Sequence, residues 1–196
     1  MRPTPDEAVT CVDVQHGHCR EFTPPAEPAP QPEGTPVVTL RDIRDFTPVA
    51  SIGHMQPRGW MVVHLPTNFY ATGGPSTKRG TLLDEPAIVR FTPVVWHWDY
   101  GDGSSTDARS PGASWAAQSA REFDPTPTSH SFAAAGKYVI QLTVGYRAEY
   151  QFADSGWLPV AGILAIDAPP LTATAESAST VLVARDCAAN PRGPGC

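Results

Sequence analysis

The stretch from residue 94 to residue 103, VVWHWDYGDG, limits the possible folds more than any other part of the chain. Large apolar side chains occupy every second position, namely Val94, Trp96, Trp98 and Tyr100. A period of two places them on one face of a β-strand. The strand should end at Gly101-Asp102-Gly103, because glycine tolerates positive φ and aspartate accepts hydrogen bonds from neighbouring backbone N–H groups.

A second stretch, SHSFAAAGKYVIQLTV at residues 129–144, repeats the pattern. Gly136 marks a turn, and alternate apolar residues follow it: Tyr138, Ile140, Leu142 and Val144. Two strands that each carry an apolar face must pack against another layer. The sequence therefore predicts two stacked β-sheets, with Trp98 and Leu142 in one core.

The two stretches together resemble the signature of the polycystic kidney disease (PKD) domain, which has W-D-F-G-D-G, then H-x-Y/F, then G-x-Y-x-V-x-L-T-V. The resemblance runs from about residue 83 to residue 144. Tyr100 replaces the usual phenylalanine, and the segment from Gly103 to His130 is much longer than usual. The resemblance implies an all-β fold, an immunoglobulin-like antiparallel β-sandwich, in a secreted or cell-surface protein without catalysis. It assigns structural roles to Trp98, Asp99, Gly101, Asp102, Gly103, His130, Gly136 and Tyr138.

Composition bounds the remaining organisation of the 196-residue chain. We expect a cysteine-bounded segment at 1–20, a proline-rich linker at 21–36, the sandwich at 37–186 and a cysteine-bounded tail at 187–196. Further strands are predicted at 37–43, 60–65, 68–71, 82–83, 87–91, 138–152, 157–166 and 180–184. Loops or turns are predicted at 47–59 and 72–79, with a turn at Glu85-Pro86.

The net charge of −6 argues against a generic nucleic-acid binder, which needs clustered Lys and Arg. No apolar run approaches the roughly 20 residues that span a bilayer. The first residues lead into no apolar signal-peptide segment, so we expect that the start has been cut away or recorded too late. The excess of Arg over Lys and the Ala/Pro-rich usage would suit a high-GC bacterium.

The four cysteines lie near the two ends of the chain: Cys11, Cys19, Cys187 and Cys196. An even number fits an oxidising compartment, and three pairings are possible. Short-range pairing, Cys11–Cys19 and Cys187–Cys196, is the simplest. The alternative is a zinc site formed by Cys11, His16, His18 and Cys19, although their spacing matches no common zinc motif.

Several residues near the central strand have alternative interpretations. Trp96 and Trp98 are predicted core residues, with sugar stacking as the alternative for one of them. Tyr138 occupies the place of a tyrosine corner, and His130 is expected to pack and to form hydrogen bonds. Asp102 should accept hydrogen bonds from N–H groups within its own turn. A calcium site is the alternative, formed by Asp99, Asp102 and Asp107.

The long segment at 104–129 is the predicted partner-binding region, because long loops in compact domains are usually functional or disordered. A short helix is expected at 114–123, with Ser114 as its N-cap. The candidate contact residues are Trp115, Arg121 and Phe123, since an exposed Trp near an Arg is typical of an interaction hot spot. In the alternative, Trp115 folds back onto the sandwich.

The sequence contains no nucleophile elbow, P-loop, HExxH motif or dinucleotide fingerprint. The sequence therefore predicts no catalytic residues and no cofactor. It favours a non-catalytic extracellular module that acts as a spacer or binds an unknown protein or polysaccharide. The alternatives are an accessory or binding domain of a secreted enzyme and a calcium-stabilised adhesion module.

Overall fold

The computed structural model describes residues 37–152, 156–178, 187–188 and 191–192. The predicted N-terminal segment and linker, and the predicted strand at 180–184, lie outside these residues. Ten strands dominate the described part, with one 3-10 turn, η1 (Ala116–Gln118). The strands are β1 (Ile52–Gln56), β2 (Trp60–Val62), β3 (Thr67–Thr72), β4 (Ser76–Leu82), β5 (Glu85–Asp99), β6 (Ser105–Ala108), β7 (Ser129–His130), β8 (Gly136–Phe152), β9 (Leu158–Asp167) and β10 (Leu171–Glu176).

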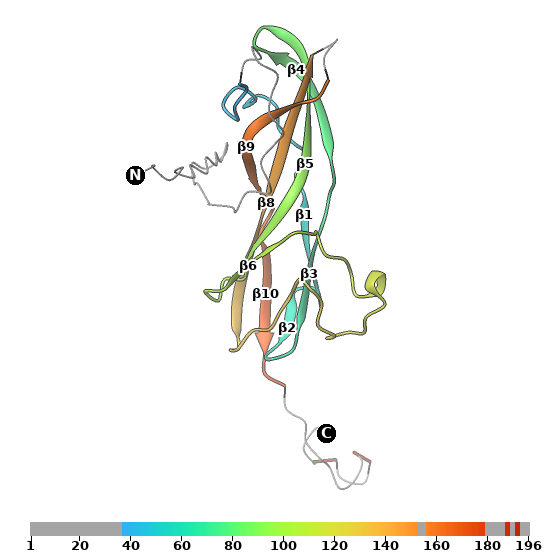
Figure 1. The fold of residues 1–196 in the computed structure, drawn as a ribbon. Helices are drawn as coiled ribbons and strands as arrows, with labels where there is room; N and C mark the ends of the chain where they lie inside the picture. Colours follow the sequence, from blue (N-terminus) through green and yellow to red (C-terminus); the bar gives the residue numbers. More distant parts are fainter. Residues whose placement is uncertain (1–36, 153–155, 179–186, 189–190, 193–196) are drawn as a thin grey trace, which may run out of the picture.

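The strands form two sheets, which confirms the predicted immunoglobulin-like β-sandwich (Figure 1). The smaller sheet has the order β1-β3-β7. The larger has the order β2-β10-β8-β5-β4, with β6 also on β5 and β9 also on β8. All strand pairs are antiparallel except β2 with β10, which is parallel. The chain crosses from the small sheet to the large one between β1 and β2, through a cis peptide bond at Gln56-Pro57.

Aromatic side chains fill the space between the sheets. Phe69 of β3 lies with its ring centre 5.4 Å from that of Trp98 and 5.2 Å from that of Tyr100, so the two layers meet at these rings. Trp98 pairs directly with Leu142 across β5 and β8, and both are buried. The predicted apolar faces of the two strands therefore do form one core.

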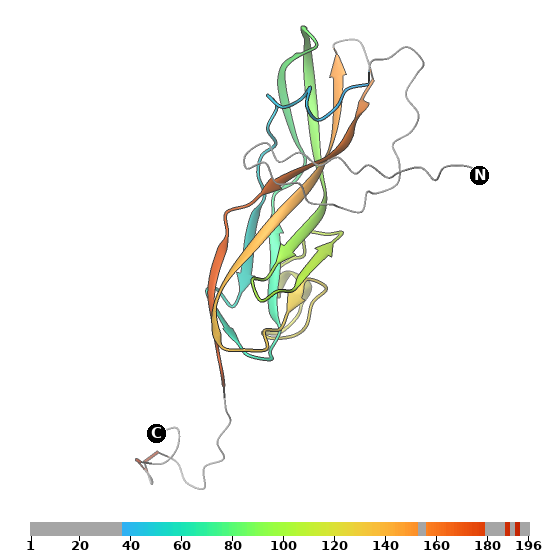
Figure 2. The same ribbon diagram turned by 90° about the vertical axis from the view of Figure 1, so that its left-hand side faces the viewer.

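The large sheet continues past the sandwich as a twisted extension of β4, β5, β8 and β9 (Figures 1 and 2). The segment before β1 covers it with buried apolar side chains, namely Val38, Leu40, Ile43 and Phe46. At the junction the Tyr146 hydroxyl lies 2.9 Å from Ser51 Oγ and accepts the Ser51 N–H at 3.1 Å. This buried polar contact ties the start of β1 to the middle of β8.

The predicted face of residues 94–100 needs one correction. The register of β5 against β8 shifts between Pro93 and Val95, where Pro93 has no N–H to donate. Val94 therefore packs in a separate small cluster around Val95, not in the core with Trp96 and Trp98. Gly145 faces Val95 at this point, and a Cβ there would lie only 2.6 Å from the valine side chain.

Four other predicted elements differ from the structure. Residues 37–43 form a turn, in which Asp42 accepts hydrogen bonds from the Thr39 N–H and hydroxyl, and not a strand. The predicted loop at 47–59 contains β1, and the predicted turn at 72–79 contains most of β4. The turn placed at Glu85-Pro86 lies at Leu83-Asp84, both with positive φ.

Among the described residues, no helix is long and apolar enough to cross a membrane.

Candidate functional site

The turn after β5 is held by its own carboxylates. Asp99 Oδ1 accepts the Gly101 N–H at 3.0 Å, and Asp102 Oδ1 accepts the Ser104 N–H at 3.0 Å. The backbone donor to Asp102 is therefore the N–H of Ser104, whereas the sequence predicted N–H donors within the Gly101–Gly103 turn. Gly101 has a φ of 74°, and a Cβ there would clash with the Val139 carbonyl oxygen. Glycine is required at this position by both conformation and space.

Asp102 also joins the turn to β7. His130 Nε2 donates to Asp102 Oδ2 at 2.7 Å, and each side chain is 20% exposed. The His130 ring stacks on Tyr100 with centres 4.0 Å apart and an interplanar angle of 8°. Desolvation acts to raise the pKa of Asp102, but hydrogen bonds from Ser104 and His130 outweigh it and hold that pKa below its usual value. Burial raises the pKa of Tyr100.

Ser104, His130 and Asp102 contact one another but do not have the geometry of a catalytic triad. In a triad the acid and the nucleophile contact different imidazole nitrogens, so that a proton passes through the ring. Here Asp102 Oδ2 and Ser104 Oγ both lie near Nε2, at 2.7 and 3.3 Å, and the Ser104 hydroxyl also donates to Asp102. This arrangement fixes the turn against β7 and offers no relay.

The three aspartates considered for calcium do not converge. Asp99 and Asp102 are occupied as described, and Asp107 on β6 accepts a hydrogen bond from His97 Nδ1 at 2.6 Å. Within the described residues, no group of three His, Cys, Asp or Glu side chains is placed to hold a metal ion. The proposed zinc ligands near residue 11 lie outside those residues.

The remaining motif residues lie beside this turn. The Tyr138 hydroxyl donates to the Ala134 carbonyl at 2.9 Å, four residues upstream, as in a tyrosine corner. Its ring packs against Phe132, with centres 4.6 Å apart. Gly136 begins β8. The motif therefore surrounds one end of the sandwich core.

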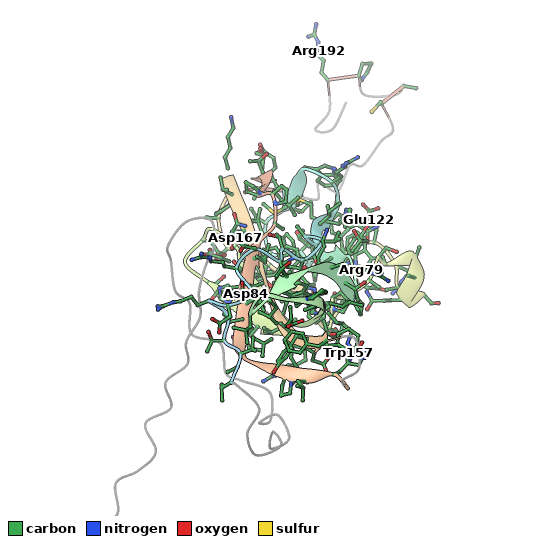
Figure 3. The ribbon with its side chains drawn as sticks, turned by 90° about the horizontal axis from the view of Figure 1, so that it is seen from above. Arg79, Asp84, Glu122, Trp157, Asp167 and Arg192 are labelled. Atoms are coloured by element: carbon green, nitrogen blue, oxygen red, sulfur yellow. The ribbon has the colours of Figure 1, made fainter. Side chains whose placement is uncertain are left out.

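The segment at 104–129 is packed against the sandwich and differs from the predicted hot spot. Trp115 is only 6% exposed, and its indole N–H donates to the Asp124 carbonyl at 3.0 Å. The predicted helix is reduced to η1, with Ser114 Oγ accepting the Ala117 N–H. Arg121 is exposed and faces Asp124. When the molecule is viewed along its long axis, Glu122 of this segment lies on the opposite side from Asp167 of β9 (Figure 3).

Buried polar contacts explain this packing. Asn68 Nδ2 donates to the Ala113 carbonyl and to Gln56 Oε1, and Gln56 Oε1 also accepts the Trp115 N–H at 2.8 Å. Phe123 is partly buried between Trp115 and Trp60, with ring centres 5.8 and 6.0 Å away. Trp60 is 46% exposed and so carries the exposed aromatic surface that the sequence assigned to Trp115.

A groove between β1 and β10 is the site that the sequence did not indicate. Its volume is about 660 Å³, and it is lined by residues 53–56, 58, 59, 70 and 170–172. His54 and Tyr70 are among the lining residues, and their rings stack with centres 5.0 Å apart. No carboxylate lines it, and Arg58 forms no ion pair with any residue the structure describes. The groove thus offers one unpaired cation and a pair of stacked rings.

The cysteines are described only in part. Cys187 is disulfide-bonded, and its partner lies outside the described residues, as do Cys11, Cys19 and Cys196. The predicted pairing stays a prediction.

One part of the chain, which includes the turn after β5, matches a known protein family. Residues 76–148, which run from β4 into β8, match the family model described as PKD domain. The span is less than half of the chain, and it contains the turn, His130 and Tyr138. No curated protein and no solved structure shows a significant match to the chain.

Proposed function

We propose that this chain is a non-catalytic extracellular module that binds a ligand in the groove between β1 and β10. The observation that carries the proposal is the groove itself, in which Arg58 has no acidic partner among the described residues. His54, Tyr70 and the nearby exposed Trp60 add aromatic surface. A few polar groups beside aromatic side chains are typical of ligand sites.

The match of residues 76–148 to the PKD family supports the rest of the proposal. Domains of this family are typically extracellular and non-catalytic, and the disulfide at Cys187 suits an oxidising compartment. The polar contacts of the turn serve packing, since Ser104 and Asp102 both contact the same ring nitrogen of His130. This supports binding over catalysis as the role of the module.

A spacer role is the second candidate, and one observation favours it. The described chain begins beside the β4–β9 extension, and β10 leaves at the opposite end of the sandwich (Figure 1). Whatever precedes residue 37 and whatever follows β10 are therefore joined to distant parts of the body. A spacer needs no ligand, so a binding test separates the two roles.

The test is a screen of the full chain against immobilised polysaccharides and peptides, in parallel with Arg58→Glu and Trp60→Ala. A ligand of the groove should be retained by the wild-type chain and lost by Arg58→Glu, because reversing an unpaired charge opposes an acidic ligand. Arg121→Glu is the matched control, since Arg121 is also an exposed arginine but lies on the 104–129 segment. If Arg58→Glu and the wild-type chain retain the same ligands, the groove does not bind and the spacer role stands alone.

A further inference from the structure

The outer edge of β1 carries backbone groups that no described strand pairs. On β3, the N–H groups of Phe69 and Ala71 point away from β1, to the carbonyls of Thr128 and Pro111 at 3.4 and 2.7 Å. Backbone groups alternate sides along a strand. The N–H and C=O groups of β3 that point toward β1 are therefore those of Asn68, Tyr70 and Thr72. Their register partners are Gln56, His54 and Ile52. The N–H and C=O of Gly53 and Met55 therefore point away from β3, on the side of the groove, which both residues line although little of their own surface is exposed.

The same reasoning applies to β10 on the other wall of the groove. Thr174 directs its N–H toward the β2 side, where it donates to the Gly59 carbonyl at 3.2 Å. Thr172, two residues earlier, directs its N–H and C=O to the same side, but β2 pairs only with residues 174–176. Thr172, Gly53 and Met55 all line the groove. Backbone groups without strand partners thus face it from both walls.

Free edges of this kind are usually protected by charged side chains or proline, because they invite pairing with another chain. β4, at the edge of the large sheet, has such protection in Lys78 and Arg79. β1 has the sequence IGHMQ, with neither lysine, arginine, acid nor proline, and its Ile52 is 55% exposed. The edge of β1 is therefore suited to receive a strand.

We propose that an extended, acidic polypeptide segment of a partner protein adds to β1 as a strand in this groove. The inference rests on the proposed binding function and names its ligand class. Pairing to Gly53 and Met55 supplies main-chain hydrogen bonds. The acidic character follows from Arg58 and the absence of a carboxylate in the lining. Alternate side chains of the segment lie beside His54 on the outer face and toward Leu171 on the inner face, so acidic and β-branched residues should alternate.

The probe is an eight-residue peptide that alternates Glu and Val, titrated into the full chain by calorimetry. We expect saturable binding. Two further peptides, methylated on the backbone nitrogen of every Glu or of every Val, test the main-chain contacts. An added strand directs alternate N–H groups to β1, so at least one methylated peptide should lose about tenfold or more in affinity. Equal binding by all three peptides would refute strand addition.

Matched variants of the protein test the groove walls. Thr172→Pro removes one N–H that faces the groove, whereas Thr172→Val keeps it. Because the Thr172 side chain is exposed, neither substitution removes a buried side chain. Thr172→Pro should weaken the peptide about tenfold and Thr172→Val should not. Arg58→Glu should weaken it at least as much, with Arg121→Glu as control. Thermal unfolding verifies that each variant folds. If Thr172→Pro and Arg58→Glu both fold and bind normally, the groove is not the site.

Other occupants give different results. If polygalacturonate binds in an Arg58-dependent way and the peptide does not, strand addition is refuted while the proposed binding function survives. A concentration-dependent dimer, detected by sedimentation and lost in Thr172→Pro, would refute the partner segment in favour of a second copy. If neither peptide, polygalacturonate nor any ligand of the screen binds, the inference and the proposed binding function fail together.

Discussion

The contact between Asp102 and His130 should be among the strongest polar interactions in the sandwich. We consider a double-mutant cycle of Asp102→Ala and His130→Ala. The two side chains are 2.7 Å apart and each is 20% exposed. A hydrogen bond to a charged group contributes about 1.5–3 kcal/mol to folding, and we expect a coupling energy in this range. As a single substitution, His130→Ala should lower the free energy of unfolding by about 0.5–1.5 kcal/mol more than this coupling energy, because it also removes the ring stacked on Tyr100.

The assay is urea unfolding followed by tryptophan fluorescence, since Trp98 is buried near Tyr100. The pKa of Asp102 is below its usual 3.8, so the ionised carboxylate favours the folded state. This contribution is fully present above the unfolded-state pKa and is lost as the pH falls through the folded-state pKa. The Asp102 contribution to the coupling should therefore be present at pH 5 and should decrease as the pH falls below about 4.

The His97–Asp107 pair is the matched control. It has a similar separation of 2.6 Å, but Asp107 is 49% exposed. Exposed pairs contribute about 0–1 kcal/mol. If the Asp102–His130 coupling does not exceed that of His97–Asp107, the turn is not fixed by this contact and the reasoning is wrong.

Three further predictions concern the core, the turn and the cysteines. Trp98→Ala should lower the free energy of unfolding by about 3–5 kcal/mol in urea titration, because it empties a fully buried aromatic site; a variant of near wild-type stability would contradict the core assignment. Trp98→Phe should cost less, since the indole N–H has no hydrogen-bond partner in the described structure. Gly101→Ala should destabilise more than Gly103→Ala, because both have positive φ but only the first places its Cβ against Val139; equal losses would show that space is not the constraint. Non-reducing peptide mapping should give Cys11–Cys19 and Cys187–Cys196, and a link between the two ends of the chain would contradict this.

Local pattern predicted the core correctly where one strand face alternates without interruption. From Tyr138 to Val144 every second residue points inward, and the partner strand carries Trp96 and Trp98 at the same period. The pattern failed at Val94 because a bulge shifts the register, and a bulge depends on the partner strand as well as on Pro93. β1 was missed because its sequence, IGHMQ, is short and places a glycine where the Trp98 ring approaches.

The candidate site was less predictable, because it depends on contacts between distant segments. The sequence left two interpretations of Trp115, an exposed contact residue or a residue folded back onto the sandwich. The second holds, because Trp115 is buried and forms hydrogen bonds to Gln56 and Asp124. Trp60 is exposed instead, because β2 is a short edge strand beside β10. The groove exists because the chain leaves the small sheet after Gln56 and joins the large one only at residue 60. No local motif encodes that crossing.

The most direct measurement of the central claim is residue-resolved hydrogen exchange by NMR on the free chain. The binding groove requires that the edge of β1 is open. The amides of Gly53, Met55 and Thr172 should therefore exchange much faster than those of His54 and Gln56, which pair with β3. Addition of the Glu-Val peptide should slow the first group selectively. If Gly53, Met55 and Thr172 are already as protected as His54 and Gln56 without ligand, the edge is covered and the groove is not a binding site.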